Sequence, residues 1–202
     1  MNQTIYPIGI QNFEKIRKDG YLYVDKTALV YQLANTGSYY FLSRPRRFGK
    51  SLLLSTLEAY FQGKKELFEG LAIANLEKEW MEYPILHLDL NAEKYSDAGA
   101  LESILRRFLN LWEDRWGKDD RETDRFTGVI RRAYEKTGRR VVVLVDEYDK
   151  PLLQALENAE LQEAYRAILK AFYGVLKTMD GYIRLAFLTG VTKFGKVSVF
   201  SD

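Results

Sequence analysis

Cysteine is absent from this 202-residue chain, and histidine occurs only once. The first absence excludes a disulfide scaffold, zinc ribbons, iron–sulfur clusters and thiol catalysis, and the second argues against a metal site built from histidines. No apolar run approaches the roughly 20 residues that a membrane span needs. The first residues also lack the basic start and apolar stretch of a signal peptide. We therefore expect a soluble cytoplasmic protein with no membrane partner.

An excess of charge of one sign is also missing, because 30 lysine and arginine residues face 28 aspartate and glutamate residues, for a net charge of +2. This balance rules out a histone-like polycation and an acidic tail protein, and it neither demands nor excludes nucleic acid as a partner. Hydrophobic residues make up 47% of the chain and aromatic residues 14%, which argues against global disorder. A chain of this length can bury about 70% of its unfolded surface without a disulfide or metal.

Helical and strand patterns alternate along the chain. Apolar runs predict strands at 38–43, 84–90, 141–145 and 183–190. Apolar residues spaced by three and four predict helices at 11–18, 26–35, 51–61, 99–116, 122–137 and 159–179. The strand at 141–145 is mostly β-branched, as is typical of a central parallel strand covered on both faces. The alternation predicts an α/β fold with a mostly parallel sheet and helices on both faces.

The segment RPRRFGKS at 44–51 lies between a predicted strand and a predicted helix, as a P-loop does. Gly49, Lys50 and Ser51 fit the end of the pattern G-x-x-x-x-G-K-[ST], whereas Arg44 stands where its first glycine is expected. In such a loop the backbone N–H groups point at phosphates, Lys50 would reach the β- and γ-phosphates, and Ser51 would place its hydroxyl on Mg²⁺. The alternative is a basic surface turn.

The segment VVVLVDEYDK at 141–150 puts two carboxylates at the end of a buried strand, where open α/β sheets bind their ligands. Asp146 could hold Mg²⁺ through its water shell, and Glu147 could polarise a water molecule as a general base. The alternative is a solvated strand end with an acidic turn. Because both motifs follow strands of one sheet, together they predict nucleotide binding.

Polar residues near these motifs are further candidates. Thr189 and Thr192 follow the last predicted strand and could touch the γ-phosphate or the attacking water, or could be satisfied by local backbone bonds. Arg46 and Arg47 could neutralise phosphate charge, reach the nucleotide of a neighbouring subunit in a homo-oligomer, or face water, and we favour the contact with an anion. His87 lies inside an apolar strand, which predicts a hydrogen-bonded core histidine.

Two other functions stay open at this point. A basic cluster could meet nucleic-acid phosphates, although such charges are more often the solvated side of a helix and its exit turn. Its members are Arg131, Arg132, Lys136, Arg139 and Arg140. A nucleotide kinase is the other alternative, but the glutamate directly after Asp146 favours activation of water and hence hydrolysis, and no arginine-rich lid segment is evident.

Five segments combine into a wider pattern. They are YPIGIQNFEKIRKDGYLYVDKT (6–27), FLSRPRRFGKSLLLSTLEAYF (41–61), LFEGLAI (67–73), VVVLVDEYDKPLL (141–153) and RLAFLTGVTKFGKVSVFSD (184–202). Together they resemble the bacterial AAA-ATPase-like proteins across nearly the whole chain. In that family the loop itself reads Arg-Pro-Arg-Arg-Phe-Gly-Lys-Ser/Thr, so Arg44 matches the family. The resemblance also marks YVDKT, with Tyr23 and Asp25 to Thr27, as a family element ahead of the P-loop, and we place it near the nucleotide as a hypothesis.

The resemblance implies a three-layer P-loop NTPase fold of the additional-strand class, which is AAA- and STAND-like, with ATP and Mg²⁺ as cofactors. The residues expected to contact ATP are Arg46, Arg47, Phe48, Gly49, Lys50, Ser51 and Leu52. Ser51 and Asp146 are the expected Mg²⁺ contacts, and the expected catalytic residues are Glu147, Lys50, Thr189 and Thr192. We expect a slow Mg²⁺-dependent ATPase, with a non-hydrolysing nucleotide-sensing switch as the alternative.

The predicted organisation is one domain over residues 1–202, with a helical element at 1–37 and a nucleotide-binding core at 38–202. Family members usually continue with a helical region and often with a segment that resembles PD-(D/E)XK nucleases, through which nucleic acid could become a partner. This sequence matches no nuclease site, so we expect a fragment or a shortened member. If the lid over the nucleotide belongs to the missing part, these 202 residues alone should hydrolyse ATP only weakly.

Overall fold

A four-stranded sheet forms the centre of the protein, and a computed structural model describes residues 5–91, 94–121 and 124–192 of it. All of its neighbouring strands pair in parallel, in the spatial order β1-β4-β3-β2. The strands are β1 (Tyr39–Ser43), β2 (Ile85–Asp89), β3 (Val141–Asp146) and β4 (Ile183–Gly190). The four predicted strands and the mostly parallel sheet are confirmed.

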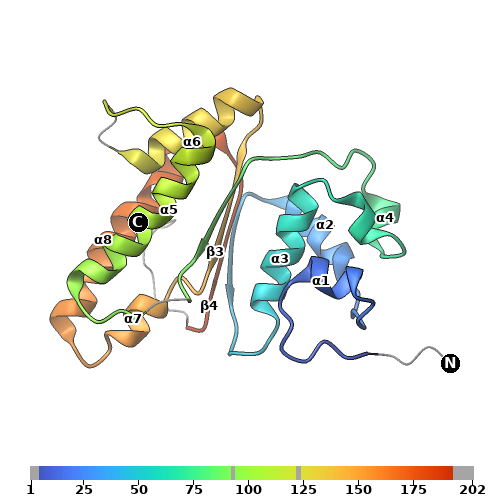
Figure 1. The fold of residues 1–202 in the computed structure, drawn as a ribbon, viewed down its shortest axis with the longest axis horizontal. Coiled ribbons are helices and arrows are strands. Elements are labelled where there is room, and N and C mark those ends of the chain that lie inside the picture. Colours follow the sequence, from blue (N-terminus) through green and yellow to red (C-terminus); the bar gives the residue numbers. More distant parts are fainter. Residues whose placement is uncertain (1–4, 92–93, 122–123, 193–202) are drawn as a thin grey trace.

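Helices cover both faces of this sheet (Figure 1). The helices on one side are α1 (Phe13–Lys18), α2 (Thr27–Thr36), α3 (Lys50–Phe61) and α4 (Ile73–Leu76). Those on the other side are α5 (Ala98–Trp116), α6 (Arg125–Thr137), α7 (Lys150–Gln154) and α8 (Ala159–Thr178). The short helices α4 and α7 have too few residues to show a periodic pattern, and the sequence did not predict them. Within the described residues, none of the helices combines the length and the apolar character that crossing a membrane requires.

The alternating side chains of β3 connect the two halves of the core. Val141, Val143 and Val145 pack in a cluster with α5, α6 and α8, while Val142 and Leu144 pack in a second cluster with α2 and α3. All of β3 is buried, since helices cover it on both faces and β2 and β4 pair with it on both edges. This position explains the uninterrupted apolar run that predicted the strand.

Side-chain caps set where three of the long helices begin. The carboxylate of Asp97 accepts the Gly99 N–H at the start of α5, and the side chain of Asn158 accepts the Leu161 N–H at the start of α8. Asp124 accepts the N–H groups of the second and third residues of α6. Helix α6 therefore begins at Arg125, whereas the sequence predicted a start at residue 122, and residues 122–123 lie outside the described ranges.

Parallel pairing brings the carboxyl ends of all four strands to one edge of the sheet. Ser43 of β1 pairs with Gly190 of β4, and Asp89 of β2 pairs with Asp146 of β3. The segments that follow these strands are the P-loop candidate, the loop around Asn91, the DEYDK segment and the loop after β4. The two motifs that the sequence singled out therefore lie at the same edge.

Candidate functional site

The loop between β1 and α3 spans residues 44–49 and has two left-handed backbone positions. Gly49, directly before α3, has φ 75°, which a glycine adopts without steric cost, whereas Arg47 has φ 67° and is strained. Arg44 is not among the residues with positive φ, and its N–H continues the sheet by donating to the Gly190 carbonyl at 3.0 Å. This position therefore accepts a side chain, which explains how arginine can replace the first glycine of the pattern.

Lys50 is the first residue of α3 and is only 5% exposed. Its Nζ donates to the backbone carbonyl oxygens of Arg44 at 3.1 Å and Pro45 at 3.3 Å. The loop therefore wraps around the ammonium group. Because both acceptors are neutral, the positive charge remains available to an anion that enters the loop.

On the other side of the site, Asp146 ends β3 and its carboxylate is held from β4. The fully buried Thr189 donates its hydroxyl to Asp146 Oδ1 at 2.5 Å. The same hydroxyl oxygen accepts the Glu147 N–H at 3.4 Å, and Glu147 has a left-handed φ of 51°. Thr189 thus fixes the geometry of both acidic residues from the adjacent strand.

A second set of hydrogen bonds joins the segments after β3 and β4. The fully buried Asp149 accepts three hydrogen bonds at Oδ2, from the N–H of Val191 at 2.9 Å and from the N–H and hydroxyl of Thr192 at 2.7 and 2.8 Å. The Tyr148 hydroxyl donates to the Thr192 carbonyl at 2.8 Å. The predicted segment around Thr192 continues into residues 193–202, which lie outside the described ranges.

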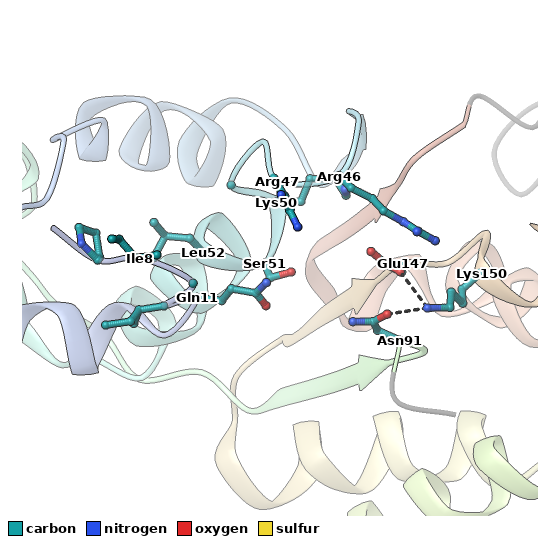
Figure 2. A pocket seen from close by; sticks show the side chains of 14 residues that line it. Ile8, Gln11, Arg46, Arg47, Lys50, Ser51, Leu52, Asn91, Glu147 and Lys150 are labelled. Atoms are coloured by element: carbon teal, nitrogen blue, oxygen red, sulfur yellow. Dashed lines mark hydrogen bonds and ion pairs between the residues drawn. The ribbon is translucent and has the colours of Figure 1, made fainter. Parts of the chain in front are cut away.

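A cavity of about 790 Å³ lies between the P-loop candidate, the end of β3 and the segment before α1 (Figure 2). The predicted site residues that line it are Arg46, Arg47, Gly49, Lys50, Ser51, Leu52 and Glu147. Four predicted residues do not line it, namely Phe48, Asp146, Thr189 and Thr192. Phe48 is largely exposed, whereas the other three make the hydrogen bonds described above, Thr189 with Asp146 and Thr192 with Asp149.

Three groups of lining residues were missed by the sequence reasoning. One is the segment Pro7 to Gln11, another is Asn91 directly after β2, and the third is Lys150 at the start of α7. The Lys150 Nζ donates to Asn91 Oδ1 at 2.7 Å and lies 3.7 Å from Glu147 Oε2 (Figure 2). The rule that ligands bind at the carboxyl ends of parallel strands could have indicated Asn91. The other two groups lie inside segments that carry the family resemblance, 6–27 and 141–153, but the motifs in those segments gave these residues no role.

The charges that line the cavity favour a polyanion. Four lining side chains are cationic, those of Arg46, Arg47, Lys50 and Lys150, and one is a carboxylate, that of Glu147. Across residues 5–91, 94–121 and 124–192, no group of three or more histidine, cysteine, aspartate or glutamate side chains could hold a metal ion.

The remaining sequence candidates lie outside the cavity. His87 Nδ1 is 3.0 Å from Glu58 Oε2, which confirms a hydrogen-bonded histidine, although its side chain is partly exposed. Burial acts to lower the pKa of His87, but the Glu58 carboxylate, with Asp89 and Asp146 further off, outweighs it and leaves the pKa raised.

The YVDKT segment connects α2 to α4. Asp25 Oδ2 accepts the Ala72 N–H at 2.7 Å, and Thr27 Oγ1 accepts the Ile73 N–H at 3.1 Å. None of Tyr23, Asp25 and Thr27 lines the cavity.

Two members of the basic cluster, Arg132 and Arg139, contact residues of neighbouring segments of the chain. Arg132 Nε donates to the Gly117 carbonyl at 2.8 Å, and the Arg139 guanidinium lies 5.8 Å from the centre of the Tyr83 ring. At these two positions the charged side chain contributes to packing.

Comparison with known proteins gives one family and one curated relative. A family model described as "Predicted AAA-ATPase" matches residues 7–200. A protein of Azotobacter chroococcum, described as an "Uncharacterized protein in vnfD 5'region", is 44% identical over 207 residues, which cover 100% of this chain and 40% of that protein. The chain thus spans about 40% of the length of this relative. No solved structure gives a significant match.

Proposed function

This chain belongs to the AAA-ATPase-like family of predicted AAA-ATPases, and on that premise we propose that it binds Mg·ATP in the cavity at the P-loop and hydrolyses it slowly. One observation carries the proposal. The loop around Lys50 and the side chain of Glu147 face the same strongly cationic cavity, at the carboxyl edge of a parallel sheet. A triphosphate supplies the negative charge that this lining lacks.

The phosphates would lie against the start of α3. Backbone N–H groups at the N-terminus of this helix have no partner within the helix and attract anions. The Lys50 ammonium would exchange its two carbonyl acceptors for the β- and γ-phosphate oxygens. Arg46 and Arg47 line the same end of the cavity and would neutralise further charge.

The adenine base of the nucleotide would occupy the part of the cavity away from the phosphates. Ile8 is 91% exposed and lies with Gln11 at the far side of the drawn cavity from Lys150 (Figure 2). An apolar side chain with this exposure offers a surface that a planar base would cover, and the Gln11 amide offers both a donor and an acceptor.

The strand order supports the additional-strand class of P-loop proteins. Strand β4 lies between β1, which leads into the P-loop, and β3, which carries the acidic pair. Thr189 on this intervening strand contacts Asp146 and so would position the acids against the phosphates.

The residues present fit a magnesium ion that arrives with the nucleotide, since Mg²⁺ at phosphates needs few protein ligands and keeps several waters. Ser51 would hold it through Oγ and Asp146 through water, and the ion would neutralise charge that develops on the phosphates. Glu147 would accept a proton from the attacking water, because its side chain faces the cavity.

Calorimetric titration with Mg·ATP tests the binding. We expect the wild-type chain to bind and Lys50→Ala to lose most of the affinity, whereas Lys170→Ala, at an exposed position of α8, should bind like the wild type. A folded wild-type chain that binds no Mg·ATP would refute the proposal for these residues.

Phosphate release then tests hydrolysis. Glu147→Gln should bind Mg·ATP like the wild type and lose turnover. A nucleotide-sensing module without turnover would instead show binding and no phosphate release in either protein. Because the chain covers 40% of its relative, the same assays on a longer chain would show whether further residues raise the rate.

A further inference from the structure

Lys150 reaches the cavity from the wall opposite the P-loop (Figure 2). Its side chain is 16% exposed, and its Nζ lies at the meeting point of three segments, namely α7, the end of β2 and the end of β3. Neither the P-loop pattern nor the acidic pair assigns it a role.

The partners of Lys150 leave its ammonium group incompletely satisfied. The group has three N–H donors, and within the described residues it makes one short hydrogen bond, to the neutral Asn91 at 2.7 Å. Glu147 Oε2 at 3.7 Å is close enough to attract the charge but too far for a good hydrogen bond. A largely desolvated cation with donors to spare, facing a cationic cavity, is suited to an anion that brings several acceptor oxygens.

We propose that Lys150 binds the terminal phosphate of a nucleoside triphosphate, an inference that rests on the function proposed above. Lys50 sits within the P-loop and would hold the β- and γ-phosphates from one side, while Lys150 would reach only the terminal phosphate from the other side. In both roles the lysine acts as a point charge with rotatable donors.

The same contact would free Glu147. A terminal phosphate carries more negative charge than a carboxylate, so the Lys150 ammonium shifts from Glu147 toward the phosphate when a triphosphate enters. The Glu147 carboxylate then loses its cationic neighbour and is available to accept a proton from water. Recognition of the terminal phosphate and readiness for hydrolysis are thereby linked through one side chain.

Titration with Mg·ATP and with Mg·ADP tests this role, because ATP carries the γ-phosphate that Lys150 is proposed to bind and ADP does not. Lys150→Met should weaken binding of Mg·ATP by about tenfold, as expected for loss of one charge-assisted hydrogen bond. Its affinity for Mg·ADP should stay within about twofold of the wild type. Lys170→Met removes an exposed lysine from α8 and serves as the matched control, with both affinities unchanged. Thermal melting shows whether each variant is folded.

Lys150→Gln provides a second test should Lys150→Met fail to fold, since the amide can still donate to Asn91 without carrying charge. Equal weakening of ATP and ADP binding, or no weakening of either, would overturn the role of Lys150. If the wild type binds both nucleotides and Lys50→Ala abolishes binding, but the Lys150 variants weaken both affinities equally or neither, this inference alone is overturned and the proposed function stands. A wild-type chain that binds neither nucleotide overturns the proposed function together with it.

Discussion

The carboxylate of Asp149 should provide most of the hydrogen bonding that holds together the segments that follow β3 and β4. Asp149→Ala removes the acceptor of three hydrogen bonds and leaves two backbone N–H groups and the Thr192 hydroxyl to find other partners. An unmade bond of this kind costs about 1–3 kcal/mol, but Val191 and Thr192 are only partly buried, so water can replace part of the loss. We therefore expect a loss of about 3 kcal/mol in the free energy of unfolding, measured by urea denaturation with tryptophan fluorescence.

Two smaller changes make this expectation specific. Thr192→Val removes one of the three donors and should cost about 1 kcal/mol. Asp149→Asn keeps one acceptor oxygen for the two backbone N–H groups and should fall between the other two variants. The slope of the unfolding free energy against urea concentration should be the same in the wild type and in all three variants, since the surface exposed on unfolding does not change. The reasoning fails if Asp149→Ala costs less than Thr192→Val, or if the two cost the same.

Three further changes test other parts of the site. Gly190→Ala would place a Cβ 2.2 Å from Tyr148 Cε1 in the core, so it should lower stability by about 1–3 kcal/mol, and an unchanged urea midpoint would contradict the packing. Arg47→Gly removes the strain of a left-handed φ of 67° and should raise the free energy of unfolding by up to about 1 kcal/mol, seen as a slightly higher urea midpoint. The same variant should bind Mg·ATP more weakly in calorimetry. Because the pKa of His87 is raised in the folded state, its pairing with Glu58 should stabilise the protein fully below about pH 6.5 and lose that effect as the pH rises through the raised value. The stability difference between the wild type and Glu58→Gln should therefore shrink as the pH rises through that raised value, and a constant difference would show that the pair does not titrate.

Most of the fold could be predicted because its signals are local. A run of five apolar residues at 141–145 is typical of a strand covered on both faces, and β3 is buried in that way. The two motifs were placed at one edge of the sheet by a general property of parallel strands, and the pairing of Asp89 with Asp146 and of Ser43 with Gly190 brings those strand ends together. Helix ends were less predictable, because caps such as that of Asp124 act at single residues.

The sequence alone was enough to predict the α/β class, the parallel sheet, the position of the P-loop candidate and the acidic pair after β3. Each of these has a signal in the order or the local pattern of residues: apolar runs, strands that alternate with helices, and two short motifs. Only the tertiary structure decided what surrounds them. The segment from Pro7 to Gln11 reaches the cavity across about forty residues of sequence, and Lys150 meets Asn91 across 59. Contacts of this range leave no periodic pattern in the sequence, because they depend on how strands and loops from distant parts of the chain come together at one edge of the sheet.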